Sequence, residues 1–299
     1  MNNAESLSLE DENWDYLIIL DACRYDYFAK THGDYLVGHL SKRVSLGSST
    51  PAWFLANFAK YHSDVIYVSG NPHINGKVPV KGIDARKNFS KIVNVWDFGW
   101  DNVLGTVPPE AINHAAIETA EAFPNKRLII HYVQPHSPYL SKDFRGHGFP
   151  EPDIADIAQD RVLVGYKATQ SGLLNTLDYR LVKTLKYLKI LRTSYKFREV
   201  LGLPPASPLE ATLRKFGTDG LRRAYEENLR IVMQQASRLC RQFLSTNPAR
   251  RIVITSDHGE LLGEKGRFGH PSRSNEPALR VVPWFQVTDT VERTQSADE

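Results

Sequence analysis

The sequence has few cysteines and no long apolar run. Of its 299 residues, only Cys23 and Cys240 are cysteines, too few for a disulfide scaffold and without the spacing of a metal-binding motif. No apolar run approaches the roughly 20 residues that a helix needs to cross a bilayer. The polar, acidic start MNNAESLSLEDENWDY lacks the pattern of a secretory signal. We therefore expect no transmembrane segment and a reduced, cytoplasmic location, with peripheral attachment to a membrane as an alternative.

The chain also has little net charge. Its 37 Lys and Arg nearly balance its 34 Asp and Glu, which leaves a formal charge of +3. Nucleic-acid binding depends on concentrated positive charge, so we expect no nucleic-acid partner. The composition, 41% hydrophobic and 24% charged, is that of a globular protein long enough to bury a sizeable core. The sequence makes no prediction about the oligomeric state.

Short runs rich in β-branched residues recur along the chain, as in buried strands. The strand candidates are Tyr16–Leu20, Val65–Val68, Ile92–Val95, Leu128–Val133, Ile252–Thr255 and Ala278–Val287. Helical patterns lie between them, including Pro109–Phe123 and Leu221–Leu244. This alternation is typical of a mainly parallel sheet covered on both faces. We therefore predict an α/β fold with a mainly parallel sheet flanked by helices.

Residues 140–219 interrupt this pattern. They contain five prolines and no convincing strand, but leucines recur at helical spacing within Leu177–Val200. From Arg180 to Arg198 there are seven Lys or Arg and no Asp or Glu. We interpret 140–219 as a helical insertion within one domain that spans 1–299. The basic face is either solvated surface or a lid that attracts an anionic substrate.

Three strand candidates end near side chains that can bind a cation. The first runs into Asp21, another leads to His136, and the strand Ile252–Thr255 is followed by Asp257 and His258. Sites in open α/β sheets form beyond the carboxyl ends of the strands, so these loops can share one rim. We expect Asp21, Asp257 and His258 to hold one divalent metal ion. Mixed carboxylate and imidazole ligands favour zinc or manganese, with calcium as an alternative.

A hydroxyl is predicted beside this metal. Thr50 followed by Pro51 predicts a helix that runs through Lys60, with Thr50 as the N-cap and proline at the first helical position. Thr50 would be a further metal ligand, and the metal would activate its hydroxyl as a nucleophile. His136 and His270 would bind the ester oxygens, or one of them would protonate the leaving group.

These residues resemble the alkaline phosphatase superfamily, on its sulfatase-like branch, in order and in spacing. The resemblance rests on Asp21, Thr50, Asp257-His258-Gly259, Gly269-His270 and the closing segment ALRVVPW. It implies that Asp21, Thr50, Asp257 and His258 bind the metal and that Thr50 forms a covalent ester. By the same resemblance, His136 and His270 match the histidines that contact the transferred group in lipoteichoic acid synthases and phosphoethanolamine transferases.

The chain departs from the family pattern at two places. Ser49-Thr50-Pro51-Ala52-Trp53 keeps the proline of the sulfatase motif Cys/Ser-x-Pro-x-Arg but has Trp53 for arginine, so we do not expect formylglycine chemistry. Ser49 and Thr50 are both candidate nucleophiles, and we prefer Thr50. Where two-metal members carry Asp-x-x-x-His, this chain has Asn228 and no histidine, so we expect a single metal ion.

The sequence thus predicts a metal-dependent hydrolase of phosphate or sulfate esters, or a phospho-group transferase. Its substrate would be an anionic small molecule, a lipid headgroup or a glycan ester. The alternative is a catalytically inactive binding or regulatory protein of the same fold. Arg24 is predicted either to bind the anionic substrate or to pair with Asp26. His131 is interpreted as a core histidine, and His73 as a loop residue without a function.

Overall fold

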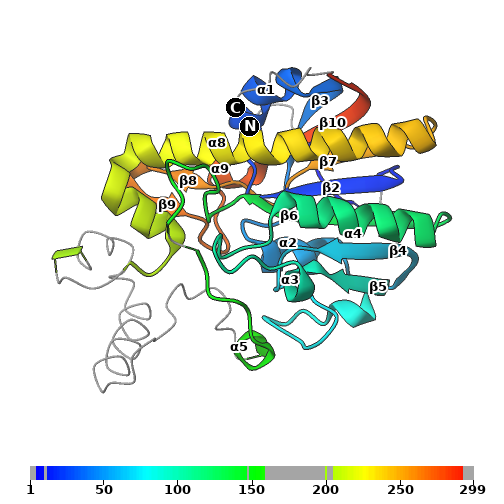
Figure 1. The fold of residues 1–299 in the computed structure, drawn as a ribbon, viewed down its shortest axis with the longest axis horizontal. Coiled ribbons are helices and arrows are strands. Elements are labelled where there is room, and N and C mark those ends of the chain that lie inside the picture. Colours follow the sequence, from blue (N-terminus) through cyan, green and yellow to red (C-terminus); the bar gives the residue numbers. More distant parts are fainter. Residues whose placement is uncertain (1–4, 10–11, 147, 159–198, 201–204, 292–299) are drawn as a thin grey trace.

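The computed structural model describes residues 5–9, 12–146, 148–158, 199–200 and 205–291 (Figure 1). Within these residues, eight strands form one sheet in the order β1-β3-β10-β7-β2-β6-β4-β5. The strands are β1 (Glu5–Ser6), β2 (Tyr16–Asp21), β3 (Leu36–Val44), β4 (His62–Ser69), β5 (Phe89–Asn94), β6 (Arg127–Pro135), β7 (Ile252–Thr255) and β10 (Val281–Thr290). The short strands β8 (Leu261–Leu262) and β9 (Phe268–Gly269) pair separately.

The centre of the sheet is parallel. Strand β2 pairs in parallel with β6 and β7, and β4 pairs in parallel with β5 and β6. Strand β10 runs antiparallel to both β7 and β3. The predicted α/β fold, with a mostly parallel sheet flanked by helices, is therefore confirmed. Strand β3 was not predicted, because only its first residue is buried and its sequence LVGHLSKRV has no long apolar run.

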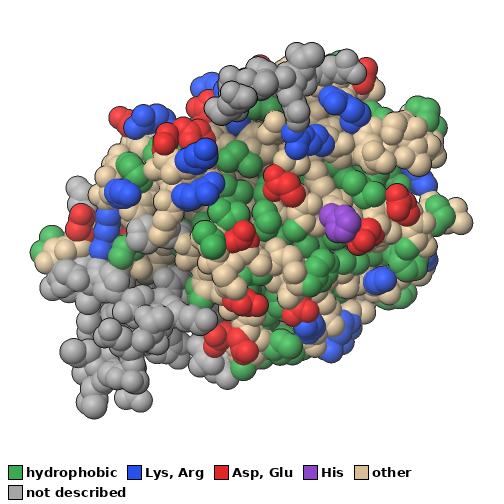
Figure 2. Space-filling view, in the orientation of Figure 1, with side chains coloured by type: hydrophobic (Ala, Val, Ile, Leu, Met, Phe, Trp, Pro, Cys, Tyr) green, Lys and Arg blue, Asp and Glu red, His purple; other side chains and the backbone are tan. Residues whose placement is uncertain are grey.

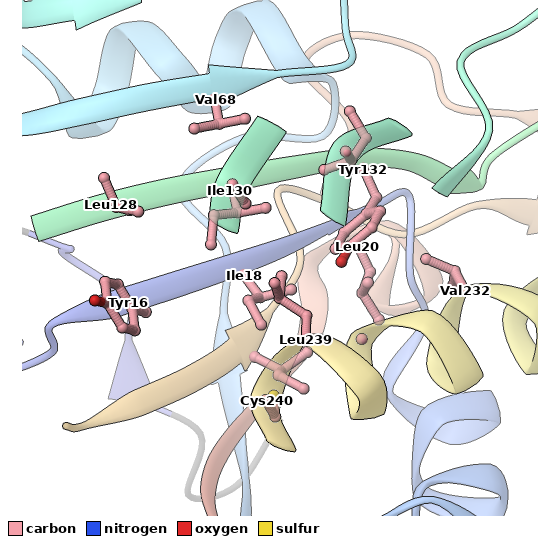
Figure 3. Packing of buried hydrophobic residues seen from close by; sticks show 14 of the residues in the cluster. Tyr16, Ile18, Leu20, Val68, Leu128, Ile130, Tyr132, Val232, Leu239 and Cys240 are labelled. Atoms are coloured by element: carbon pink, nitrogen blue, oxygen red, sulfur yellow. The ribbon is translucent and has the colours of Figure 1, made fainter. Parts of the chain in front are cut away.

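Helices cover both faces of this sheet. They are α1 (Tyr25–Thr31), α2 (Thr50–Asn57), α3 (Val95–Phe98), α4 (Pro109–Ala122), α5 (Ile154–Ala158), α8 (Pro208–Thr246) and α9 (Pro277–Arg280). In Figure 1, α4 and α8 run along one face. Alternate residues of a strand point to opposite faces. Accordingly Ile18 and Leu20 of β2 pack toward Val232 and Leu239 of α8 (Figure 3).

The opposite face of the sheet carries the second core. Ile19 of β2 and Ile129 of β6 cluster there with Trp53 and Phe54 of α2. Asp21 has the same parity as Ile19, so its side chain lies on this face of the sheet, beside α2. The strand pattern therefore places the carboxylate near the helix that carries Thr50.

Helix α8 begins earlier than the predicted Leu221. It starts at Pro208, where the Ser207 hydroxyl accepts a hydrogen bond from the Glu210 amide, and it contains a kink at Gly217 with φ 68°. The end of the predicted insertion 140–219 is thus part of α8. The basic run from Arg180 to Arg198 lies outside the described residues, and the boundary of the insertion stays a prediction.

No helix in the described ranges combines the length and the apolar character that a bilayer span requires. On the face shown in Figure 2, basic and acidic side chains are interspersed among apolar ones.

Candidate active site

The ends of β2 and β7 are tied together at the rim of the sheet. Ser256 Oγ donates to the carbonyl of Leu20 at 2.6 Å and accepts from the Cys23 amide at 2.8 Å. The two strands are parallel neighbours, so this link fixes the residues that follow each of them. Asp21 and Asp257 consequently leave adjacent strands side by side.

The turn after Asp21 is strained and held by side chains. Ala22 has a left-handed φ of 59°, which typically costs a non-glycine residue about 1–3 kcal/mol. Its amide donates to Asp257 Oδ1 at 3.0 Å, and its carbonyl accepts from the Tyr225 hydroxyl at 2.7 Å. Such strain persists only where the surroundings over-determine the backbone, as they do at this rim.

Gly259 is needed because another backbone passes close to it. A Cβ at this position would lie 2.0 Å from the carbonyl oxygen of Ala278 in α9. The Gly259 amide donates to Leu279 O at 2.9 Å. The glycine after His258 thus lets α9 pack directly beneath the site.

Thr50 is the first helical residue of α2, and Ser49 is its N-cap. Ser49 has an extended backbone, and its carbonyl accepts from the Trp53 amide at 2.9 Å. The prediction that Thr50 is the N-cap was therefore wrong by one residue. Thr50 Oγ1 donates instead to Asp257 Oδ2 at 2.8 Å. The Thr50 hydroxyl thus bonds to a carboxylate far away in the sequence and does not cap the helix.

Four buried side chains converge on one point. His258 Nε2 lies 3.4 Å from Thr50 Oγ1, 3.3 Å from Asp257 Oδ2 and 3.8 Å from Asp21 Oδ1. Each of these residues is no more than 4% exposed. His258 Nδ1 bonds to the carbonyl of Gly259 at 2.8 Å, which leaves the Nε2 lone pair facing the three oxygens.

This arrangement fits a divalent cation. Zinc binds nitrogen and oxygen at about 2.0–2.2 Å, so tetrahedral ligand atoms lie about 3.3–3.6 Å apart. The contacts around His258 Nε2 are close to that spacing. The donor set, two carboxylates with an imidazole and a hydroxyl, suits zinc or manganese.

Asp21 is held as an anion. Burial by itself raises the pKa of Asp21, but the adjacent imidazoles of His131, His136 and His258 hold the pKa well below its ordinary value. Asn71 Nδ2 also donates to Asp21 Oδ2 at 2.7 Å. Asn71 follows β4 at the same edge of the sheet, so the strand-end rule that found Asp21 could have found it too.

A second group lies beside the first. His136 Nε2 is 3.0 Å from His270 Nε2 and 4.0 Å from Glu260 Oε2. The three side chains each offer a ligand atom within 4.8 Å of the others. Both Glu260 oxygens are buried without a hydrogen-bond partner, and burial raises the pKa of Glu260 to about 8. Burial, followed by the nearby imidazoles of His258 and His136, lowers the pKa of His270 well below its usual value.

Sequence reasoning did not assign Glu260 to the site. Its signal was its place two residues after His258, where a carboxylate follows the same strand end. The structure places both Glu260 and His73 in the wall of the site, although His73 was expected to have no function. Burial lowers the pKa of His73 to about 3, so this imidazole is neutral.

Asn228 holds the loop that carries His136. Its side-chain amide donates at 3.1 Å to each of the carbonyls of Pro135, His136 and Pro138, and its oxygen accepts from the Leu140 amide at 3.0 Å. The position at which two-metal members carry a further metal ligand is therefore occupied by a fully buried amide that holds this loop.

Arg24 does not line the cavity. Its Nη2 lies 2.8 Å from Asp26 Oδ2, Nη1 pairs with Glu264, and Nη1 also donates to the carbonyl of Glu260 at 3.2 Å. Its side chain is 11% exposed. Of the two predicted roles, the pairing with Asp26 is the one that the structure shows. The guanidinium is occupied by carboxylates of its own chain and supports the segment after His258.

A cavity of about 810 Å³ lies over both groups. Its walls include Thr50, Asp21, His136, His270 and Glu260, together with Lys81, Arg273, Trp100, Phe149 and His73. It is therefore larger than a transferred phosphate or sulfate group would need, and its two cationic side chains favour an anionic occupant.

The chain is similar to several solved structures. The integral membrane lipooligosaccharide phosphoethanolamine transferase A from Neisseria meningitidis is 12% identical over 96% of this chain and 52% of its own, with a TM-score of 0.46. The C-terminal periplasmic domain of EcEptC from Escherichia coli, solved in complex with Zn, is 10% identical over 96% of this chain and 78% of its own, with a TM-score of 0.45. A protein in the alkaline phosphatase superfamily from Vibrio parahaemolyticus is 10% identical over 97% and 64%, with a TM-score of 0.45.

No protein family and no curated protein sequence matches the chain. The chain spans about half the length of the Neisseria transferase, 52%. One similar structure is that of a periplasmic domain, and the cytoplasmic location expected from the sequence stays a prediction. Function is accordingly inferred from the side chains of this chain.

Proposed function

We propose that the chain is a metal-dependent enzyme that acts on phosphate or sulfate esters with Thr50 as its nucleophile. The observation that supports this most directly is the position of Thr50 Oγ1, 2.8 Å from Asp257 Oδ2 and 3.4 Å from His258 Nε2. Asp21 completes the group from the neighbouring strand. Ser49 is the weaker candidate, because its hydroxyl lies 3.3 Å from that of Ser272 and makes no hydrogen bond to Asp257 among the described residues.

The residues divide the chemistry between them. A bound cation would lower the pKa of the Thr50 hydroxyl and offset charge on the transferred group. Asp257 orients Oγ1 through its hydrogen bond, and Oγ1 attacks the phosphorus or sulfur atom while the bond to the leaving oxygen breaks. The ester is then carried on Thr50 until water or an acceptor hydroxyl displaces it. The N-terminus of α2 favours the negative charge held there.

His136 and His270 together supply one donor and one acceptor. His136 Nδ1 donates to the carbonyl of Ser137 at 2.6 Å, so the Nε2 of neutral His136 is an acceptor. The 3.0 Å contact then requires His270 to carry its proton on Nε2. In this proposal the Nε2–H of His270 donates to the ester oxygens or to the leaving oxygen. Nε2 of His136 accepts the proton that the Thr50 hydroxyl releases.

The rest of the cavity supports an anionic substrate larger than the transferred group. Lys81 and Arg273 bring positive charge, and Trp100 and Phe149 bring aromatic surface. A lipid headgroup or glycan ester is complementary to both, because it has an anionic group for the cations and a surface that can pack on the aromatic rings. Hydrolysis and transfer share the first step and differ in what displaces the ester from Thr50.

Metal analysis followed by an activity screen tests the proposal. The purified protein should hold one equivalent of zinc or manganese, or take it up, and should turn over a nitrophenyl phosphate, phosphodiester or sulfate. Asp257→Ala and His258→Ala should abolish metal binding and turnover while circular dichroism shows the fold intact. Equal turnover by wild type and Asp257→Ala would refute the mechanism. A folded protein without stoichiometric metal and without turnover would favour the inactive binding protein.

A further inference from the structure

His131 lies in the middle of β6, where it is fully buried between two apolar strands. It is in register with Ile19 of β2 and with Ser69 of β4. Its ring meets Trp53 and Tyr67, which belong to the core on the α2 face. That is the face toward which the side chain of Asp21 points, so the strand register brings His131 and Asp21 together.

The hydrogen bond with Tyr67 determines which nitrogen of His131 carries the proton. Tyr67 Oη lies 2.7 Å from His131 Nδ1, and both residues are fully buried. The phenol has one proton, and His131 is the acceptor within its reach among the described residues. Burial also raises the pKa of Tyr67 well above its ordinary value, so the proton stays on the phenol. A neutral imidazole that accepts at Nδ1 carries its own proton at Nε2.

The two oxygens of Asp21 then have different partners. Oδ2 accepts from Asn71 Nδ2 at 2.7 Å. It also lies 3.5 Å from His131 Nε2, a buried nitrogen without a hydrogen-bond partner among the described residues. Oδ1 lies 3.8 Å from His258 Nε2, on the side of the convergent group. One oxygen is therefore held by Asn71 and faces Nε2 of His131, and the other faces the cation site.

We infer that His131 is a positioning residue, which donates from Nε2 to Asp21 Oδ2 and so presents Asp21 Oδ1 to the metal. Tyr67, His131 and Asp21 form one chain of donors and acceptors that ends at the candidate ligand. This inference rests on the metal site of the proposed function. It replaces the interpretation of His131 as a core histidine, because the buried imidazole would orient the carboxylate of Asp21.

The geometry also offers a rival role for His131. Asp21, His131 and Asp257 each place a ligand atom within 4.8 Å of the others, so His131 could bind the metal itself. The Tyr67 bond opposes this, because a nitrogen that carries a proton has no lone pair for a metal. A proton on Nε2 of His131 therefore indicates a donor to Asp21, and an unprotonated Nε2 indicates a metal ligand.

Two variants and a matched control test the inference. Tyr67→Phe removes the phenol proton, and His131→Leu removes the donor to Asp21. The control is Tyr132→Phe, the next residue of β6, which loses a buried hydrogen bond to Asn113 Oδ1 on the opposite face. Zinc affinity should fall about 10–100-fold in the first two, as is typical for partners of metal ligands. The control should bind zinc as tightly as wild type, although all three variants should have a lower melting temperature than wild type.

Histidine ¹⁵N NMR of the wild-type protein gives a second measurement. We expect His131 to carry its proton on Nε2 both without metal and with one equivalent of zinc. A proton on Nδ1 in the metal-free protein, direct bonding of Nε2 to zinc, or unchanged zinc affinity in Tyr67→Phe and His131→Leu would each overturn the inference. If wild type binds neither zinc nor manganese, the metal site of the proposed function is refuted, while the tautomer in the metal-free protein still tests the bond between Tyr67 and His131.

Discussion

The side-chain amide of Asn228 donates to the main-chain carbonyl of His136 at 3.1 Å, and it thereby joins α8 to a loop of the candidate active site. The same amide reaches Pro135 and Pro138, the residues on either side of that loop segment. A long helix packed on the sheet thus sets the position of an imidazole at the sheet's rim. The clamp is fully buried, so water cannot replace it without a change in packing.

Asn228→Ala should reduce turnover more than its effect on stability explains. Removing the amide leaves buried carbonyls unsatisfied, which typically costs about 1–3 kcal/mol of the free energy of unfolding. Freed from the clamp, His136 should shift enough to lower kcat about 10–100-fold. Asn113→Ala is the control, because Asn113 Nδ2 bonds to the carbonyl of Gln235 at 2.9 Å away from the site. Equal losses of kcat in both variants at temperatures where both are folded would contradict a positioning role.

Thr50→Val should reduce turnover to background, because it keeps the shape and removes the hydroxyl that bonds to Asp257. Loss of a nucleophile in a covalent mechanism typically lowers kcat by about 10⁴–10⁶-fold. Thr50→Ser should retain part of the activity. Ser49→Ala should stay near wild type, since the Ser49 hydroxyl contacts Ser272. Loss of activity in Ser49→Ala with retention in Thr50→Val would reverse the assignment of the nucleophile.

The sequence predicted those parts of the fold that local pattern determines. Strand β7 was predicted with the observed bounds because its four residues are all apolar or β-branched and all buried. Strand β3 was missed because most of its residues are exposed or only partly buried, so its sequence lacks a run of apolar residues. The convergence of Asp21 with His258 followed from the rule that sites form at strand ends.

The remaining site features depend on contacts between distant segments. Thr50 was assigned to the N-cap because local rules could not include Asp257, 207 residues away. The clamp made by Asn228 depends on where α8 crosses a loop 92 residues earlier in the chain. The role of Glu260 depends on its burial against His136, which no sequence interval specifies.

Asp15 should link the stability of the sheet to pH. It precedes β2 and accepts from Arg251, which precedes β7, through the backbone amide at 2.8 Å and the guanidinium at 2.9 and 3.0 Å. The hydrogen bond from Arg251 lowers the pKa of Asp15. A carboxyl whose pKa is lowered by folding stabilises the protein above its unfolded pKa of about 3.9, and this contribution is lost as the pH falls through the folded value.

Asp15→Asn should therefore lower the urea midpoint of unfolding at neutral pH. The difference from wild type should shrink as the pH falls from about 5 to 3, where the wild-type carboxyl also takes up a proton. Glu118→Gln, a change at an exposed carboxylate of α4, is the control for a general effect of charge. A difference between Asp15→Asn and wild type that does not vary with pH would show that the carboxylate's charge contributes nothing.

Lys81 and Arg273 should determine how tightly an anionic substrate binds. Both line the cavity, and both have a left-handed backbone, with φ 49° and 63°. Lys81→Gln and Arg273→Gln should each raise KM about 10-fold for a substrate with a charged leaving group, since a charged hydrogen bond is worth about 1.5–3 kcal/mol. They should change kcat little, and their effect should weaken with added salt.

Lys265→Gln is the matched control for these two changes. Lys265 also has a left-handed φ, of 52°, and its side chain is exposed, but it does not line the cavity. A neutral nitrophenyl leaving group provides a matched substrate, for which the cavity variants should resemble wild type. If Lys265→Gln raises KM as much as Arg273→Gln does, the effect comes from overall charge and the cavity cations do not bind the substrate. If KM rises equally for charged and neutral leaving groups, Lys81 and Arg273 shape the cavity without recognising an anion.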